Sequence, residues 1–182
     1  MALQRTDSYL KDSTEVFKNY KKVGENAMAQ CPDAGLVALL DPEANSIGTI
    51  VKHLSGNMIS RWTNFLTSDG EKPTRNRDAE FEKPPKNRAE ILDLWDGGWK
   101  CLFSALEGLS DADMTKTVTI RGEEHSVMQA INRQIAHYSC HVGQIVLLAK
   151  HYAGANWKSL TVPKKKSAEF NDDVAAGKKS QR

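Results

Sequence analysis

Two of the five histidines in this 182-residue chain, His137 and His141, are spaced so that they could hold a metal ion together. They lie four residues apart in a segment with helical periodicity, and at about 100° per residue their side chains project about 40° apart. His53 occupies the matching border of the apolar stripe in an earlier helical segment, next to Ile50 and Leu54. If the two segments pack together, three neutral imidazoles converge. Catalytic zinc sites use this ligand set, which also suits nickel, iron or manganese.

The histidine spacing also has structural explanations. Among five histidines in a chain of this length, a pair four residues apart arises by chance about one time in ten, so either residue could be a surface or core polar group. Tyr138 stands where the glutamate of the HEXXH zinc-protease motif would be, which excludes the simplest metalloprotease. His125 and His151 lie away from the pair and are expected to be structural or surface residues.

Polar residues near the three histidines could orient the imidazoles or anchor a substrate. Asn57 and Arg61 follow His53 by four and eight residues on the same side of a helix, and Gln144 follows His141 by three. A ligating imidazole usually donates its second nitrogen to such a partner. Hydrogen bonds between helices or at caps are an equal alternative. Cys140 is projected about 100° away from His141, so the sequence assigns no catalytic residue.

The segment 68–86 is dense in charge and contains three prolines, which predicts a long loop. This loop could cover a metal cleft, and Arg75 and Arg77 could then bind a substrate carboxylate in a fork. A solvated charge run or a salt-bridged dimer contact is the interpretation that the charge pattern favours.

Four long segments with helical periodicity must position these groups, at about residues 7–30, 45–67, 87–109 and 126–154. Their starts carry capping signals: Asn45-Ser46, Asn87 with Glu90, and Ser126 with Gln129. The alternating segment Thr115 to Ile120, followed by Arg121-Gly122, predicts a small hairpin before the last helix. The fold class is therefore all-α, and four amphipathic helices of about 20 residues suggest a four-helix bundle.

Composition narrows the class of protein. The chain has 25 basic and 23 acidic residues, so its net charge of +2 does not suggest nucleic-acid binding. No apolar stretch approaches the roughly 18 residues of a membrane-spanning helix, and the polar N-terminus lacks a secretory signal. Three widely spaced cysteines form neither a disulfide framework nor a cysteine-based zinc module. We expect a cytoplasmic protein with one domain over residues 1–162 and a polar, Lys-rich tail over 163–182.

Three separated motifs resemble one protein family. They are the run SIGTIVKHLSGNMISRWTNFLTSD from Ser46 to Asp69, which continues through Glu82, the segment INRQIAHYSCHVGQIVLLAK from Ile131 to Lys150, and NWKSLTVPKKKS near the C-terminus. Together they resemble the DinB/YfiT-like superfamily, in its uncharacterised DUF1572-type branch, over residues 8–168. The resemblance implies an up-down-down-up four-helix bundle, commonly dimeric, that holds a divalent metal. The three histidines of the family fall on His53, His137 and His141.

The resemblance leaves two classes of function open. Characterised relatives include bacillithiol S-transferases and mycothiol-dependent maleylpyruvate isomerase, whereas other members have no known activity. The chain is thus expected to be a metal-dependent transferase that joins a small thiol to an electrophilic substrate, or a hydrolase that uses water. The alternative is a non-catalytic metal-binding or stress-linked dimeric bundle. The second and third helical segments carry more apolar surface than packing within one bundle needs, which predicts a homodimer. This surface comes from Trp62, Trp95, Trp99 and Phe103.

Overall fold

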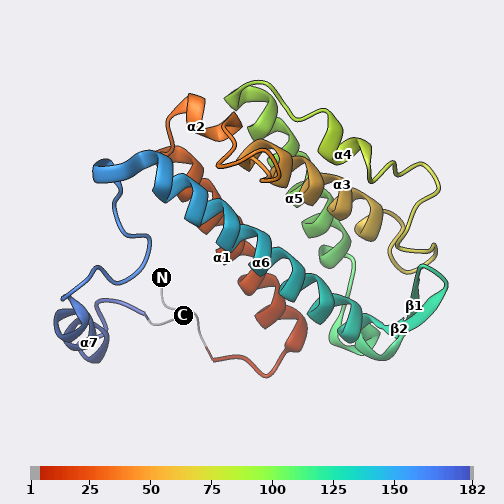
Figure 1. Ribbon diagram of the computed structural model, residues 1–182. Coiled ribbons are helices and arrows are strands. Elements are labelled where there is room, and N and C mark those ends of the chain that lie inside the picture. The colour runs from red at the N-terminus through yellow and green to blue at the C-terminus, as the bar shows by residue number, and fades with distance from the viewer. Residues whose placement is uncertain (1–4, 181–182) are drawn as a thin grey trace.

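The computed structural model describes residues 5–180, which are mostly helical (Figure 1). The four long helices are α1 (Tyr9–Gln30), α3 (Ile47–Trp62), α5 (Arg88–Glu107) and α6 (Val127–Ala153). The short helices are α2 (Asp33–Val37), α4 (Ala79–Glu82) and α7 (Ser167–Ala175), with 3₁₀ turns at Asp111–Thr115 and Gly154–Asn156. A hairpin of β1 (Thr117–Ile120) and β2 (Glu123–Ser126) precedes α6.

The four predicted long helices are confirmed, with shifted ends. Their N-terminal caps form as the sequence indicates: Ser46 accepts from the backbone N–H of Thr49, Asn87 from that of Glu90, and Ser126 forms a capping box with Gln129. Helix α3 ends at Trp62, five residues before the predicted end, and Asn64 just beyond adopts a positive φ of 49° that a helix does not allow.

The long helices pack around one apolar core. The most extensive contacts pair α3 with α5 and α1 with α6, while α3 also contacts α6 and α1 contacts α5. The segment between α3 and α5 returns along the length of α3, so these two helices run in the same direction, as do α1 and α6 (Figure 1). Helices α3 and α6, which are far apart in the sequence, therefore face each other across the core.

The tryptophans expected at a dimer interface lie inside this core instead. Trp62, Trp95 and Trp99 are each at most 2% exposed, and Phe103 is half-buried against Trp99 with ring centroids 5.8 Å apart. The chain thus buries the aromatic surface from which a homodimer was predicted, and that basis for the prediction is wrong. The homodimer itself stays a prediction, which sedimentation at micromolar concentration would test.

The predicted hairpin is confirmed. Its strands pair antiparallel from Thr117 opposite Ser126 to Ile120 opposite Glu123. Arg121 and Gly122 both have positive φ, 56° and 79°, as a two-residue type I′ turn requires. The side chain of Asp69 accepts hydrogen bonds from both backbone N–H groups of this turn, at 2.9 and 2.8 Å, and so fastens the start of the charged loop to the hairpin.

Two segments expected to be irregular contain helix. The charged loop 68–86 forms α4, and the ammonium group of Lys52 on α3 donates to the backbone carbonyls of Ala79 and Lys83, both at 2.6 Å. The Lys-rich segment 163–182 contains α7, which lies apart from the four long helices (Figure 1). None of the helices within residues 5–180 is both long and apolar enough to cross a membrane.

Close packing of α5 against α3 requires the glycine at position 98, but not the neighbouring Gly97. A Cβ at Gly98 would lie 2.9 Å from Cα of Ser55 on α3, whereas a Cβ at Gly97 would meet nothing within 4 Å. We predict that Gly98→Ala lowers the free energy of unfolding by about 1–3 kcal/mol. Gly97→Ala should raise it by about 0.5–1 kcal/mol. Chemical denaturation of both variants tests this, and effects of equal sign would contradict the packing described.

Candidate metal centre

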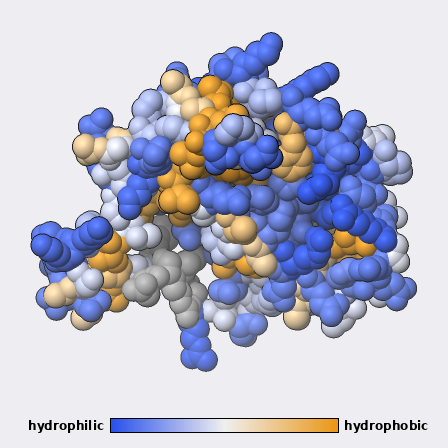
Figure 2. All heavy atoms as spheres, viewed as in Figure 1, coloured by the Kyte–Doolittle hydropathy of each residue, from blue (hydrophilic) through white to orange (hydrophobic). Residues whose placement is uncertain are grey.

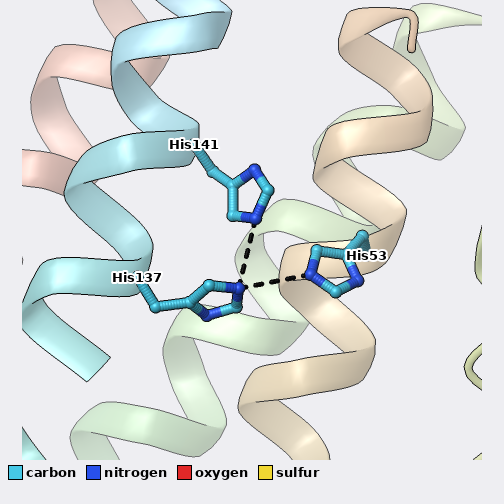
Figure 3. A group of neighbouring side chains, drawn as sticks. All are labelled: His53, His137 and His141. Atoms are coloured by element: carbon cyan, nitrogen blue, oxygen red, sulfur yellow. Dashed lines mark hydrogen bonds between the residues drawn. The ribbon is translucent and has the colours of Figure 1, made fainter. Parts of the chain in front are cut away.

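Three histidines from two facing helices converge on one point. His53 lies on α3, and His137 and His141 lie one turn apart on α6. Figure 3 shows the three rings in the space between these helices, each with its Nε2 atom turned towards the others. Packing of α3 against α6 thus brings together residues that are 84 positions apart in the sequence.

The distances between the nitrogens suit a shared metal ion. Nε2 of His137 lies 3.3 Å from Nε2 of His53 and 3.1 Å from Nε2 of His141. One ligand atom from each of the three residues lies within 4.8 Å of the other two. Nitrogens that bind one first-row ion at about 2.0–2.1 Å are themselves about 3–4 Å apart. The three-histidine group (His53, His137 and His141, below called the triad) can therefore hold a metal ion.

Two hydrogen bonds fix the orientation of the His53 and His141 rings. Both are made by the ring nitrogen that faces away from the centre of the triad, and they are called outer hydrogen bonds below. Nδ1 of His53 donates to Oε2 of Glu80 at 2.8 Å, and Nδ1 of His141 donates to Oε1 of Gln144 at 2.8 Å. Both acceptors are oxygens, so the proton of each neutral ring is on Nδ1 and the lone pair of Nε2 points into the triad. Ligating histidines in metalloproteins are commonly held by such partners.

The triad cannot satisfy its own inward nitrogens. With His53 and His141 both protonated on Nδ1, only His137 could donate from Nε2, and it can donate to only one neighbour at a time. Nδ1 of His137 is buried without a hydrogen-bond partner. A cation at the centre would satisfy all three lone pairs together, so the donor chemistry of the triad fits a divalent metal ion.

The environment keeps two of the rings neutral. Burial, together with the neighbouring His141 and His53, lowers the pKa of His137 to about 3. Burial also lowers the pKa of His141, and this effect outweighs the opposing hydrogen bond to Gln144. A neutral imidazole is the form that binds metal, so little proton competition is expected at neutral pH.

Glu80 is one of the residues that sequence reasoning missed. It lies on α4, is 6% exposed, and contacts both His53 and Arg75, whose Nε and Nη2 donate to its two carboxylate oxygens at 2.8 and 3.0 Å. Burial raises the pKa of Glu80, but the hydrogen bonds from His53 and Arg75 outweigh it, and the net pKa lies below the ordinary value. Glu80 is 27 residues from His53 in the sequence, and no periodic pattern links the two.

The charged loop is an ordered ion-pair network at this point, not a solvated run. The side chain of Arg75 is only 5% exposed, so the interpretation of this residue as part of a solvated run is wrong. Glu71 accepts from Arg61 and Arg121 at 3.0 Å each and from Arg75 at 3.5 Å. Arg75 is thus held by Glu80 and Glu71 of its own chain.

The other predicted residues lie around the triad in different ways. Gln144 contacts His141, as described. Asn57 is buried and its Oδ1 accepts from Nε2 of Gln134 at 2.6 Å and from the hydroxyl of Tyr138 at 3.1 Å, and neither partner belongs to the triad. Arg61 is buried and donates to Glu71 and to the carbonyl of Gly70, while its Nε has no partner. Cys140 is exposed on α6.

A cavity of about 320 Å³ adjoins the triad on the side of His137. Below it is called the arginine cavity, because it is lined by five arginines together with Asn57 and His137: Arg61, Arg75, Arg77, Arg121 and Arg133. Four of the five polar residues predicted near the triad therefore line one space, and Gln144 lies outside it. His125 and His151 are not part of the triad or of this cavity.

One comparison with known proteins finds a match. The model of the family described as "Protein of unknown function (DUF1572)" matches residues 4–166. A search of the curated proteins finds no match. The matched range contains all three triad histidines, Glu80 and the five arginines of the cavity. Because the family model covers most of the 182 residues, the chain belongs to the DUF1572 family.

Proposed function

We propose that this protein holds one divalent metal ion on Nε2 of His53, His137 and His141, within a DinB/YfiT-like bundle of up-down-down-up topology. The observation that carries the proposal is the pair of outer hydrogen bonds, from Nδ1 of His53 to Glu80 and from Nδ1 of His141 to Gln144, which turn two ring lone pairs inward. The shared direction of α3 with α5 and of α1 with α6 supports the topology. Zinc or nickel suits three imidazoles best, with manganese or iron as alternatives.

The metal centre is proposed to be catalytic rather than structural. Structural zinc sites use four protein ligands, whereas catalytic sites use three and leave a position open. Among residues 5–180, the group able to hold the ion contains three donors, and the arginine cavity adjoins it. An ion bound to three neutral imidazoles keeps its full +2 charge and would supply Lewis acidity, which lowers the pKa of a coordinated thiol or water.

The residues of the chain would bind and orient the reactants. Glu80 and Gln144 hold two rings in position, and the arginine cavity offers space and charge for a substrate beside His137. The triad has no serine, cysteine or threonine among its hydrogen-bond partners in the described part of the chain. The reaction class that follows is transfer or hydrolysis with a nucleophile from outside the protein, a small thiol first and water second.

A panel of electrophiles assayed with several small thiols tests this function. Zinc-loaded protein should show thiol-dependent turnover, and both the metal-stripped protein and His137→Ala should lose it. His151→Ala is the matched control, because His151 is an exposed residue of the same helix. Equal turnover by all forms would contradict the proposal. Stoichiometric metal binding without turnover by any form would favour the non-catalytic metal-binding alternative.

A further inference from the structure

The arginine cavity concentrates more positive charge than its own carboxylates neutralise. Five arginines line it, and the carboxylates that form ion pairs with them are Glu71 and Glu80. The cavity thus has an excess of three positive charges. Like charges held close together repel one another, and an anion in the same space removes this cost.

Arg77 and Arg133 are the two cavity arginines whose positive charge is not balanced by an ion pair in the described part of the chain. The guanidinium of Arg77 lies 5.4 Å from the ring centre of Phe81, and Nη1 of Arg133 donates to Oε1 of Gln134 at 3.1 Å. Neither arginine is in an ion pair with a carboxylate in the described part of the chain. Both are exposed overall, so they are accessible to a ligand that enters from solvent. On the face in Figure 2, hydrophilic side chains cover most of the half that carries the hairpin.

His137 gives a second, independent indication of a ligand. It is the triad ring without an outer acceptor, because its Nδ1 is buried and unpartnered while the other two rings have Glu80 and Gln144. In Figure 3 the Nδ1 edge of this ring faces away from His141. His137 also lines the arginine cavity, one helical turn after Arg133. When Nε2 of His137 binds metal, Nδ1 carries a proton that needs an acceptor.

We propose that the arginine cavity binds the anionic group of the substrate, a carboxylate or phosphate held by Arg77 and Arg133, and that this anion provides the acceptor that Nδ1 of His137 lacks. Guanidinium groups bind both kinds of oxyanion in a bidentate manner. The identity of the anion as part of a substrate rests on the proposed function, whereas the anion site itself rests on the charge and geometry of the cavity.

Metal and anion would then bind cooperatively. The metal places the proton of His137 on Nδ1, which favours the anion, and the anion makes His137 a better ligand for the metal. Linkage requires that each increases the affinity for the other by the same factor. Altering an outer partner of a ligating histidine typically changes metal affinity by about 10–100-fold, so we expect a coupling factor of about tenfold.

Calorimetric titration tests the anion site. Inorganic phosphate and succinate are titrated into zinc-loaded and metal-free protein, with succinamide as the uncharged analogue. Both anions should bind, succinamide should not, and zinc should tighten anion binding about tenfold. The double variant R77Q/R133Q should weaken anion binding about 10–100-fold. The control K100Q/K150Q removes the same charge from exposed positions on α5 and α6 and should leave binding unchanged.

The outcomes separate this proposal from the metal proposal. Zinc affinity in the absence of anion should be nearly the same in R77Q/R133Q and the unaltered protein. Undiminished anion binding by zinc-loaded R77Q/R133Q would mean that the anion coordinates the zinc, and undiminished binding by either form would overturn the arginine site. Arginine-dependent anion binding without any zinc binding would retain the anion site and refute the metal centre. Zinc binding without anion binding would retain the metal centre and refute the anion site.

Discussion

Replacing His137 by alanine should abolish stoichiometric metal binding while leaving the helical content nearly intact. Nε2 of His137 lies within 3.3 Å of Nε2 in both other rings, so its loss removes the central ligand of the triad. The decrease in affinity should exceed the roughly 10–100-fold effect of altering only an outer hydrogen-bond partner. Isothermal titration with zinc gives the affinity, and far-ultraviolet circular dichroism gives the helical content.

The stability of the metal-free protein should change little in the same variant. His137 is held in the apo protein with a buried, unpartnered Nδ1, an arrangement that costs free energy. Its removal should therefore alter the free energy of unfolding by no more than about 1–2 kcal/mol. His151→Ala on the same helix should retain full zinc affinity. A His137→Ala protein that still binds one zinc as tightly as the unaltered chain would refute the role of His137 as a ligand.

Glu80→Gln should weaken both the fold and the metal centre. The glutamine keeps the size of the side chain but removes the charge that balances Arg75, whose side chain is 5% exposed. Removing one partner of a buried ion pair typically costs about 3–5 kcal/mol. The outer hydrogen bond of His53 also weakens, so zinc affinity should fall about 10–100-fold. Denaturant unfolding and zinc titration measure the two effects.

A matched control and the pH dependence distinguish the role of Glu80 from a general effect of removing a negative charge from α4. Glu82 is an exposed carboxylate on the same short helix, and Glu82→Gln should leave both quantities nearly unchanged. Because the pKa of Glu80 is lowered in the folded protein, its stabilisation is present above the unfolded pKa of about 4.3. That stabilisation disappears as the pH falls through the lowered folded value. The stability gap between unaltered protein and Glu80→Gln should therefore narrow in acid, and a constant gap would contradict this role.

The long helices and the hairpin could be predicted from the sequence because they depend on interactions between residues that are close together in the chain. Capping residues such as Ser46 and Ser126, apolar periodicity and the Arg121-Gly122 turn each act over a few residues, so the long helices and the hairpin could be predicted. The convergence of His53 with His137 could be predicted because all three histidines lie at the borders of apolar stripes that must pack together.

Contacts between distant segments could not be predicted in the same way. Glu80 reaches His53 only because the charged loop folds back over α3 through Lys52 and a short helix, and no spacing rule connects those positions. Apolar character alone does not tell which side of a helix faces a partner chain, so the sequence pattern does not distinguish these buried tryptophans from surplus apolar surface. The requirement for Gly98 likewise comes from Ser55 on the neighbouring helix.

X-ray absorption spectroscopy of the protein with one equivalent of zinc tests the central claim most directly. The protein is purified without chelator or immobilised nickel, stripped, and loaded with zinc in a buffer free of thiols and phosphate. We predict one zinc per chain with three imidazole nitrogens at about 2.0–2.1 Å and one further light-atom ligand. Zinc bound without an imidazole signal, zinc bound to sulfur, or less than one tightly held ion per chain would contradict a metal centre at His53, His137 and His141.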